Sequence, residues 1–279
     1  MVVDCHTHIR SASMQNLDAS EHLAAADVVG KCIVLASCLP NDVVGGGEQS
    51  RQGHLTVDSS SEQINKHLSQ YVARYENKMV GFAFIDPLTD GVGVKNLKAS
   101  TEKLGLKGLV LYCSQSAFHP AHTRAMQLYE SAQDLHLPVF FHNTSVGQGG
   151  ILEYAYPFLL DEVARTFPEL KIIVGNMGFP FYEQTLCLVA KHKNVFADLS
   201  VKPGNVWQIY NVVASAYEQG VMDKLLFGSA YPAAKAQDCM ESLFGFNKLL
   251  AGAALPVVPR SAIQSIIERE TLKLLGIEK

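Results

Sequence analysis

Two histidines near the start of the chain have the spacing of a metal site. His6 and His8 stand two residues apart in the run Val2–His8, which opens with two β-branched residues. In a β-strand successive side chains alternate between faces, so Asp4, His6 and His8 point the same way. Two imidazoles on one face can bind a single metal ion. The alternative is a polar strand end that makes ordinary hydrogen bonds.

A third histidine, His142, stands at the end of the apolar run Pro138–Asn143. If both runs are strands of one barrel, three neutral imidazoles converge and leave an open position on a zinc ion. Zinc lowers the pKa of a bound water and supplies hydroxide near neutral pH. The alternative for His142 is a core histidine bonded to backbone. His54 and His119 lie in loops expected at the same end and are weaker candidates for substrate contact.

Eight short apolar runs, separated by helical patterns, predict the elements that position these histidines. Most runs are nearly continuous in Val, Ile, Leu and Phe, which is typical of parallel strands buried on both faces. The predicted strands are Val2–His8, Lys31–Cys38, Met79–Asp86, Gly108–Tyr112, Pro138–Asn143, Lys171–Asn176, Val195–Ser200 and Leu225–Pro232. The predicted helices are Ser20–Val29, Ser60–Asn77, Val92–Leu104, Ala121–Leu135, Ile151–Phe167, Pro180–Lys191, Val206–Glu218, Cys239–Ala251 and Ser261–Leu275.

This alternation predicts a (β/α)8 TIM barrel formed as a single domain over residues 1–279. The alternative is an open doubly wound sheet, but no G-x-G-x-x-G motif opens a helix. In a barrel the active site lies at the C-terminal ends of the strands. The long segment Pro40–Thr56 follows the second strand there, as a functional lid or a surface excursion. The Gly-rich segment Thr144–Gly150 follows the fifth strand on the same face.

Composition narrows the classes of function. Apolar residues make up 48% of the chain and charged residues 18%, which suits a large core. The net charge of −4 and the absence of a basic cluster argue against nucleic acid and membrane surfaces as partners. We expect no secretory signal and no membrane span, since no apolar run approaches ~20 residues.

The positions of the cysteines and of the remaining histidines predict their redox state and their exposure. The six cysteines form no C-x-x-C pair, which indicates reduced core thiols in a cytoplasmic protein. Four other histidines are expected on the surface of helices or at their ends: His22, His67, His136 and His192.

Six short motifs lie in order at the ends of predicted strands or just before them. They are D-x-H-x-H at Asp4–His8, G-x-K-G at Gly105–Gly108, the histidine that closes Pro138–His142, N-x-G at Asn176–Gly178, D-x-S at Asp198–Ser200 and F-G-S-A-Y-P at Phe227–Pro232. Together they resemble the amidohydrolase superfamily. The specific resemblance is to its amidohydrolase-related branch, which includes aminocarboxymuconate-semialdehyde decarboxylase.

The resemblance implies a metal held by His6, His8, His142 and an aspartate at the end of strand eight. The chain departs from the family pattern at two positions, Asn176 and Ala230, where the family has histidine and aspartate. Alanine can neither bind a metal nor accept a proton. Asparagine cannot shuttle protons near pH 7. The catalytic positions of the family are therefore altered here.

The sequence thus predicts an amidohydrolase-like metal-dependent hydrolase, or a non-oxidative decarboxylase, for a small carboxylated molecule. The cofactor would be one divalent metal per chain, zinc by its ligands, with a metal-free enzyme as a variant. Asn176 would orient the substrate, and Asp198, a supporting residue in the family, is a weak candidate for the base. The alternatives are a catalytically impaired paralogue that keeps the pocket for binding, and a laboratory variant with Ala230 introduced to trap substrate. The resemblance also implies a homodimer.

Overall fold

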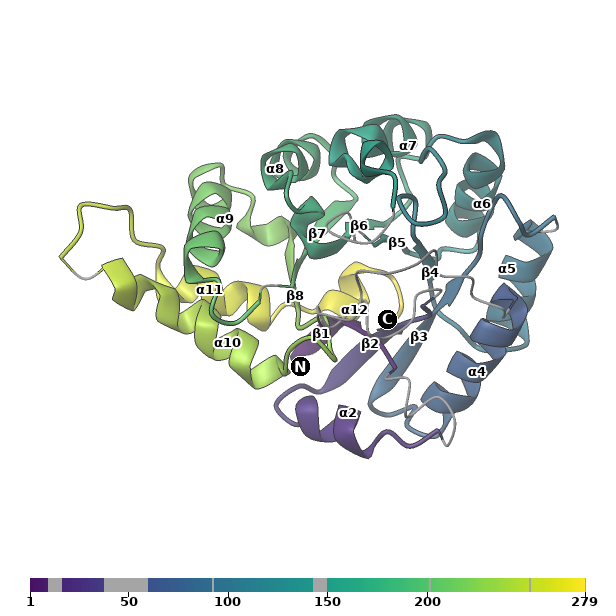
Figure 1. Ribbon diagram of the computed structural model, residues 1–279, viewed down its shortest axis with the longest axis horizontal. Helices are drawn as coiled ribbons and strands as arrows, with labels where there is room; N and C mark the ends of the chain where they lie inside the picture. Colours follow the sequence, from purple (N-terminus) through teal and green to yellow (C-terminus); the bar gives the residue numbers. More distant parts are fainter. Residues whose placement is uncertain are drawn as a thin grey trace.

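The apolar runs of the sequence form one sheet of eight parallel strands in chain order, β1 to β8 (Figure 1). The computed structural model describes residues 1–9, 17–37, 60–91, 93–142, 150–200, 202–250 and 252–278. The strands are β1 (Val3–Thr7), β2 (Lys31–Leu35), β3 (Met79–Phe84), β4 (Leu109–Leu111), β5 (Val139–Phe141), β6 (Ile172–Val174), β7 (Val195–Ser200) and β8 (Leu225–Gly228). Each lies within the run that predicted it.

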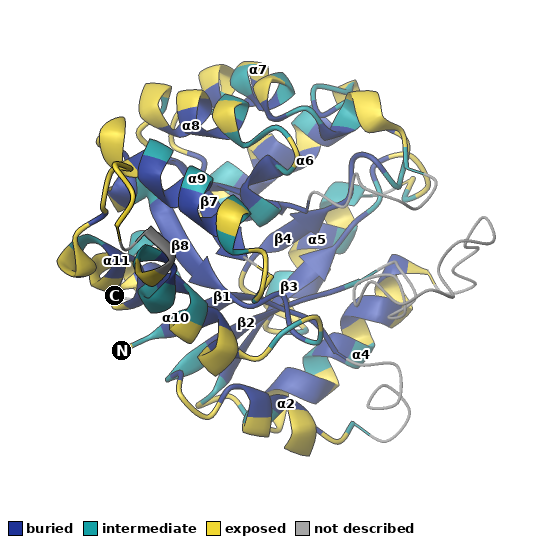
Figure 2. Cartoon of the chain, turned by 60° about the vertical axis from the view of Figure 1, so that its left-hand side comes forward, coloured by how far each residue is buried: buried dark blue, intermediate teal, exposed yellow. Residues whose placement is uncertain are grey.

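The first and last strands meet and close the sheet into a barrel. Thr7, at the end of β1, pairs in parallel with Tyr231, which follows β8. The amide of His8 donates to the carbonyl of Tyr231 over 2.8 Å. Buried residues follow the strands and the inner sides of the helices, while exposed residues lie on the outside (Figure 2). The predicted (β/α)8 barrel is confirmed.

Helices cover the outside of the barrel, between successive strands and after β8 (Figure 1). They are α2 (Ser20–Ala25), α4 (Ser61–Ala73), α5 (Gly93–Glu102), α6 (Thr123–Asp134), α7 (Leu160–Thr166), α8 (Tyr182–Lys191), α9 (Val206–Glu218), α10 (Ala236–Gly245), α11 (Arg260–Ile267) and α12 (Thr271–Leu274). Among these described helices, none is long and apolar enough to cross a membrane.

The predicted helix Ile151–Phe167 is divided in the structure. Two 3-10 turns, Leu152–Ala155 and Pro157–Leu159, precede α7. The break lies at Tyr156, whose ψ of 120° is extended. The ring of the following proline disfavours the helical region for the preceding residue and removes a backbone donor. The prediction of a single helix, made from apolar spacing, was therefore wrong for the first half of this segment.

Two predicted loops cannot be compared with the structure, and one prediction about the cysteines needs correction. The segment Pro40–Thr56, which contains His54, lies outside the described residues, and so does Thr144–Gly150 apart from Gly150. The five cysteines within the described ranges form no disulfides, and four of them are buried. Cys187 is exposed on α8, so the prediction of a core thiol was wrong there.

Asn65 shows how a helix is joined to the end of a buried strand. It lies on α4, is 1% exposed, and donates from Nδ2 to the carbonyl of Phe84 over 2.8 Å. The amide of Phe84 donates back to Oδ1 of Asn65, also over 2.8 Å. One side chain therefore satisfies both backbone groups of the last residue of β3.

We predict that Asn65→Leu lowers the free energy of unfolding by about 3 kcal/mol, because it leaves two buried backbone groups unpaired at about 1–3 kcal/mol each. Urea unfolding followed by circular dichroism measures the change. Asn211→Leu is the control, since the side chain of Asn211 donates to the carbonyl of Trp207 at the surface. Equal losses in the two variants would contradict this role for Asn65.

Candidate metal centre

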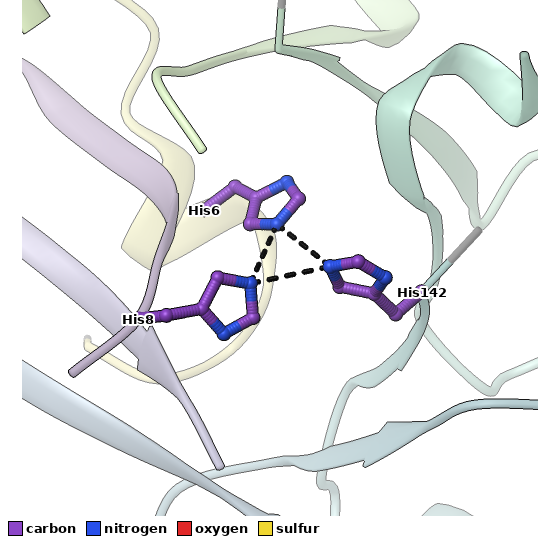
Figure 3. A group of neighbouring side chains, drawn as sticks. All are labelled: His6, His8 and His142. Carbon is purple, nitrogen blue, oxygen red and sulfur yellow. Dashed lines mark hydrogen bonds between the residues drawn. The ribbon is translucent and has the colours of Figure 1, made fainter. Parts of the chain in front are cut away.

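Three histidine side chains converge at the mouth of the barrel (Figure 3). His6 lies in β1, His8 follows it, and His142 follows β5. The Nε2 atom of His6 lies 3.0 Å from the Nε2 atoms of both other histidines, which are 3.2 Å from each other. All three residues are buried. In a tetrahedral zinc site with bonds of about 2.0–2.1 Å, ligand nitrogens are about 3.3 Å apart.

Burial keeps two of these rings neutral. The pKa values of His8 and His142 lie well below the ordinary histidine value, chiefly because burial disfavours the charged form and secondly because His6 is close. A metal binds the deprotonated imidazole, so no proton has to be displaced from these rings at neutral pH. The three histidines expected from the sequence are thus arranged as a group that could hold a metal ion.

Asp198 orients His6 from behind. This residue of β7 is fully buried, and its Oδ2 accepts a hydrogen bond of 2.6 Å from Nδ1 of His6. Since Nδ1 carries the proton, the lone pair of His6 Nε2 faces the other two histidines. Ser200 Oγ donates to Oδ1 of Asp198 over 2.6 Å, and the amide of Asn176 donates to Oδ2 over 3.0 Å.

This arrangement is the carboxylate–histidine pair that commonly supports metal ligands. Both carboxylate oxygens of Asp198 accept hydrogen bonds, so Asp198 supports His6 and is poorly placed to act as a free base. Sequence reasoning did not find the contact with His6. The D-x-S motif on β7 was the signal that could have suggested it.

Gly228 makes room for this contact at the end of β8. A Cβ atom at this position would lie 2.2 Å from Oδ1 of Asp198, 2.6 Å from Oγ of Ser200 and 3.1 Å from Cβ of His6. Carbon atoms do not approach that closely, so any larger residue would displace the group. The glycine of the F-G-S motif is therefore required because side chains of β1 and β7 meet beside it.

Asp4 fastens β1 to the segment after β8. Its buried Oδ1 accepts the amides of His6 over 3.2 Å and of Ser229 over 3.0 Å. Burial raises the pKa of Asp4 to about 6, although these hydrogen bonds oppose the shift. Asp4 thus holds the backbone of a candidate ligand and does not belong to the histidine group itself.

Both positions that depart from the family pattern have left-handed backbone. Asn176 has φ 49° and Ala230 has φ 53°. Asparagine tolerates this region, whereas alanine is disfavoured there by about 1–2 kcal/mol. Ala230 lies at the mouth because its neighbours Ser229 and Tyr231 bond to Asp4 and His8.

The side chains at these two positions differ in what they offer. The Oδ1 atom of Asn176 is buried and has no hydrogen-bond partner in the described chain. It can accept a hydrogen bond from a ligand. The methyl group of Ala230 can neither bind a metal nor transfer a proton.

The structure says less about His119 and His54, the weaker candidates for substrate contact. His119 is half-buried after β4, and its Nδ1 accepts the amide of Ala121 over 3.0 Å, within its own turn. Contact of His119 with a substrate stays a prediction. His54 lies outside the described residues.

His22 corrects an expectation of surface exposure. It is 2% exposed on α2, and its ring stacks on Tyr231 with centroids 4.4 Å apart. Its Nδ1 lies 3.2 Å from the hydroxyl of Tyr71. Burial lowers the pKa of His22 to about 4. The apolar pattern of α2 is too short to indicate which side faces the barrel.

Comparisons with known proteins agree with this geometry. The family model described as amidohydrolase matches residues 3–251. The structure of 5-carboxyvanillate decarboxylase from Sphingomonas paucimobilis is similar, with a TM-score of 0.66, 13% identity and 99% of both chains covered. A comparison of the sequence with curated proteins finds no match.

Two further solved structures are similar. 4-Oxalomesaconate hydratase from Rhodopseudomonas palustris has a TM-score of 0.64 and 14% identity, covering 99% of this chain and 96% of that one. A 5-carboxyvanillate decarboxylase mutant from Novosphingobium aromaticivorans, with bound manganese, has a TM-score of 0.65 and 12% identity, covering 99% and 97%. At such identities these structures support the fold.

We predict that Ala230→Gly raises the free energy of unfolding by about 1 kcal/mol, because glycine adopts positive φ without a steric cost. Urea unfolding measures the difference. Ala216→Gly is the control: Ala216 is buried within α9, where glycine is disfavoured by about 1 kcal/mol. A loss at both positions would show that residue 230 is not held in this conformation.

A second prediction concerns acid sensitivity at His22. Unfolded histidine binds a proton near pH 6.5, whereas buried His22 binds one only near pH 4. Its contribution to stability is therefore present above pH 6.5 and is lost as pH falls toward 4. Between pH 7 and pH 4.5 the wild type should lose about 2 kcal/mol more than His22→Phe.

Urea unfolding at a series of pH values tests this, with the exposed His136→Phe as the matched control. That control should keep the wild-type slope. Parallel curves for wild type and His22→Phe would contradict the burial of a neutral His22.

Proposed function

We propose, from the premise that the chain belongs to the amidohydrolase family, that it is a metal-dependent enzyme acting on a small carboxylated molecule at the barrel mouth. The reaction is hydrolysis of an amide- or ester-like bond, or non-oxidative decarboxylation. The observation that carries the proposal is the meeting of three buried Nε2 atoms within 3.2 Å of one another. Three nitrogen ligands with one position left open are typical of catalytic zinc sites.

His6, His8 and His142 would hold one divalent ion. Zinc suits three imidazoles, and manganese is the second ion to test because a structure of similar fold contains it. Such an ion, when bound, supplies Lewis-acid polarisation of an oxygen and activation of water. Asp198 keeps His6 in the tautomer that binding requires.

The charge of the ligand set favours an anionic substrate. Alanine occupies the position of the family's aspartate, and burial keeps His8 and His142 neutral. Three neutral ligands cancel none of the ion's double charge, and the carboxylate of Asp198 behind His6 offsets only part of it, so the remaining positive charge attracts a carboxylate in this buried site. The name of the structurally similar 5-carboxyvanillate decarboxylase also points to carboxylated substrates.

We assign to Asn176 the role of orienting the substrate. Its buried Oδ1 is without a partner in the described ranges, and its amide nitrogen can donate to a carboxylate. Neither Asn176 nor Ala230 can transfer a proton. We therefore expect the site to lack part of the general acid–base contribution, which is typically about 10²–10⁴ in rate.

We further propose a cytoplasmic location and a homodimeric assembly. The lack of disulfides among the five described cysteines suits a reducing compartment. The net charge of −4 gives no support for a nucleic acid or membrane partner. The homodimer rests on the resemblance to the family branch, and light scattering of the purified protein measures it.

We predict that the purified protein binds about one zinc or manganese ion per chain, and that His142→Ala binds much less because one of three ligands is lost. Metal analysis after loading and desalting measures both. His136→Ala is the matched control, since His136 is exposed on the outside of the barrel after α6. A wild type that binds neither metal, or a His142→Ala variant that binds as well, would contradict the site.

The reaction is tested with a panel of small carboxylic acids, lactones and amides. Release of CO2 identifies decarboxylation, and appearance of a new acid or amine identifies hydrolysis. Turnover by the unmodified, metal-loaded protein supports the proposal, and His142→Ala should abolish it. Turnover that arises only after Ala230→Asp and Asn176→His are introduced together would instead identify a binding protein with an impaired site.

A further inference from the structure

A small cavity is lined in part by His142. Its volume is about 30 Å3. It lies between the end of β5, the segment after β4 and the 3-10 turns before α7. Its walls are mainly apolar, from residues such as Phe141, Leu160 and Val174, and they also include His142 and Ser114.

Two residues of these walls each have a buried polar atom that lacks a partner. Nδ1 of His142 and Oγ of Ser114 are both buried, and neither has a hydrogen bond within the described residues. Their side chains are 5% and 2% exposed, so bulk solvent does not serve either atom. A buried polar group left unpaired costs about 1–3 kcal/mol.

The protonation of His142 makes its Nδ1 a donor. A neutral imidazole carries one N–H, and Nε2 must be free of hydrogen to face a metal together with His6 and His8. Nδ1 therefore carries the proton. The ring stacks on Tyr112 with centroids 4.8 Å apart and planes 29° apart, which holds its orientation. The N–H therefore needs an acceptor, and the cavity that His142 lines has room for one.

We propose that this cavity binds one ordered water molecule, which accepts from Nδ1 of His142 and bonds to the hydroxyl of Ser114. The inference rests on the proposed metal site. A water needs about 10–15 Å3 and at least two polar partners, and the cavity offers both.

Ser114 is thereby a positioning residue for His142. It acts through the water as Asp198 acts directly on His6, by fixing the tautomer and the angle of the ring. Partners behind metal ligands typically contribute 10–100-fold to metal affinity. The hydroxyl is uncharged and acts through water, so we expect an effect near the lower end, about tenfold.

Zinc affinity measured by competition with a chromophoric chelator tests the role of Ser114. Ser114→Ala should bind zinc about tenfold more weakly than the wild type. Ser131→Ala is the matched control, because the Oγ of Ser131 on α6 is likewise buried without a partner and is not part of the cavity wall. It should bind as the wild type does. Unchanged affinity in Ser114→Ala overturns the proposal, whereas a wild type that binds no zinc overturns the metal site itself.

Nitrogen NMR of the zinc-loaded protein, labelled at histidine, provides a readout that a merely structural serine would not move. The Nδ1–H signal of His142 should be present in the wild type and in Ser131→Ala, and should shift in Ser114→Ala. An unshifted signal contradicts the role of Ser114.

A high-resolution crystal structure of the unmodified protein tests the proposal without a variant, so the result does not depend on whether a variant folds. It should show a water within about 2.7–3.2 Å of both Nδ1 of His142 and Oγ of Ser114. An empty cavity, or a direct protein acceptor on Nδ1, would overturn the proposal.

Discussion

The hydrogen bond from Nδ1 of His6 to Oδ2 of Asp198 is the contact on which the candidate site depends. Its length is 2.6 Å, and it joins residues 192 positions apart in the chain. It sets the tautomer of His6 and turns the Nε2 lone pair toward His8 and His142. It exists only because the barrel closes and because Gly228 leaves no Cβ between β1 and β7. The order of the strands and the glycine at position 228 are therefore both required for the tautomer of His6 that can bind a metal.

The departures from the family pattern leave this support intact. Asn176 contributes its backbone amide to Asp198, so the side chain at this position can change without disturbing the hold on His6. Ala230 lies between two residues that bind β1 through Asp4 and His8. The scaffold and the three converging histidines are preserved. The two altered side chains, an amide and a methyl group, offer neither a proton carrier nor a negative charge at their positions.

The fold and the three histidines could be predicted because each depends on local pattern. Continuous apolar runs indicate buried parallel strands, and period-two alternation places His6 and His8 on one face. The family match agrees with the resemblance carried by the six motifs. The pairing of Asp198 with His6 does not follow from apolar periodicity, since it requires the closed barrel; the D-x-S motif was the one sequence signal that could have suggested it. His22 was misplaced because α2 has only six residues. The break before α7 follows from one proline, whose local effect outweighed helical spacing.

The cavity beside His142 likewise results from packing between segments that are distant in the sequence. No local sequence pattern predicts it. It suggests that two ligands of one centre are held differently, His6 by a carboxylate and His142 by a neutral hydroxyl through water.

The central claim is that three imidazoles form one metal centre without a carboxylate ligand from the end of β8. X-ray absorption spectroscopy of the zinc-loaded protein tests it most directly. The account predicts three nitrogen ligands at about 2.0–2.1 Å with the multiple scattering of imidazole, and no sulfur. A shell with fewer than three imidazoles, or one that contains sulfur, would contradict it.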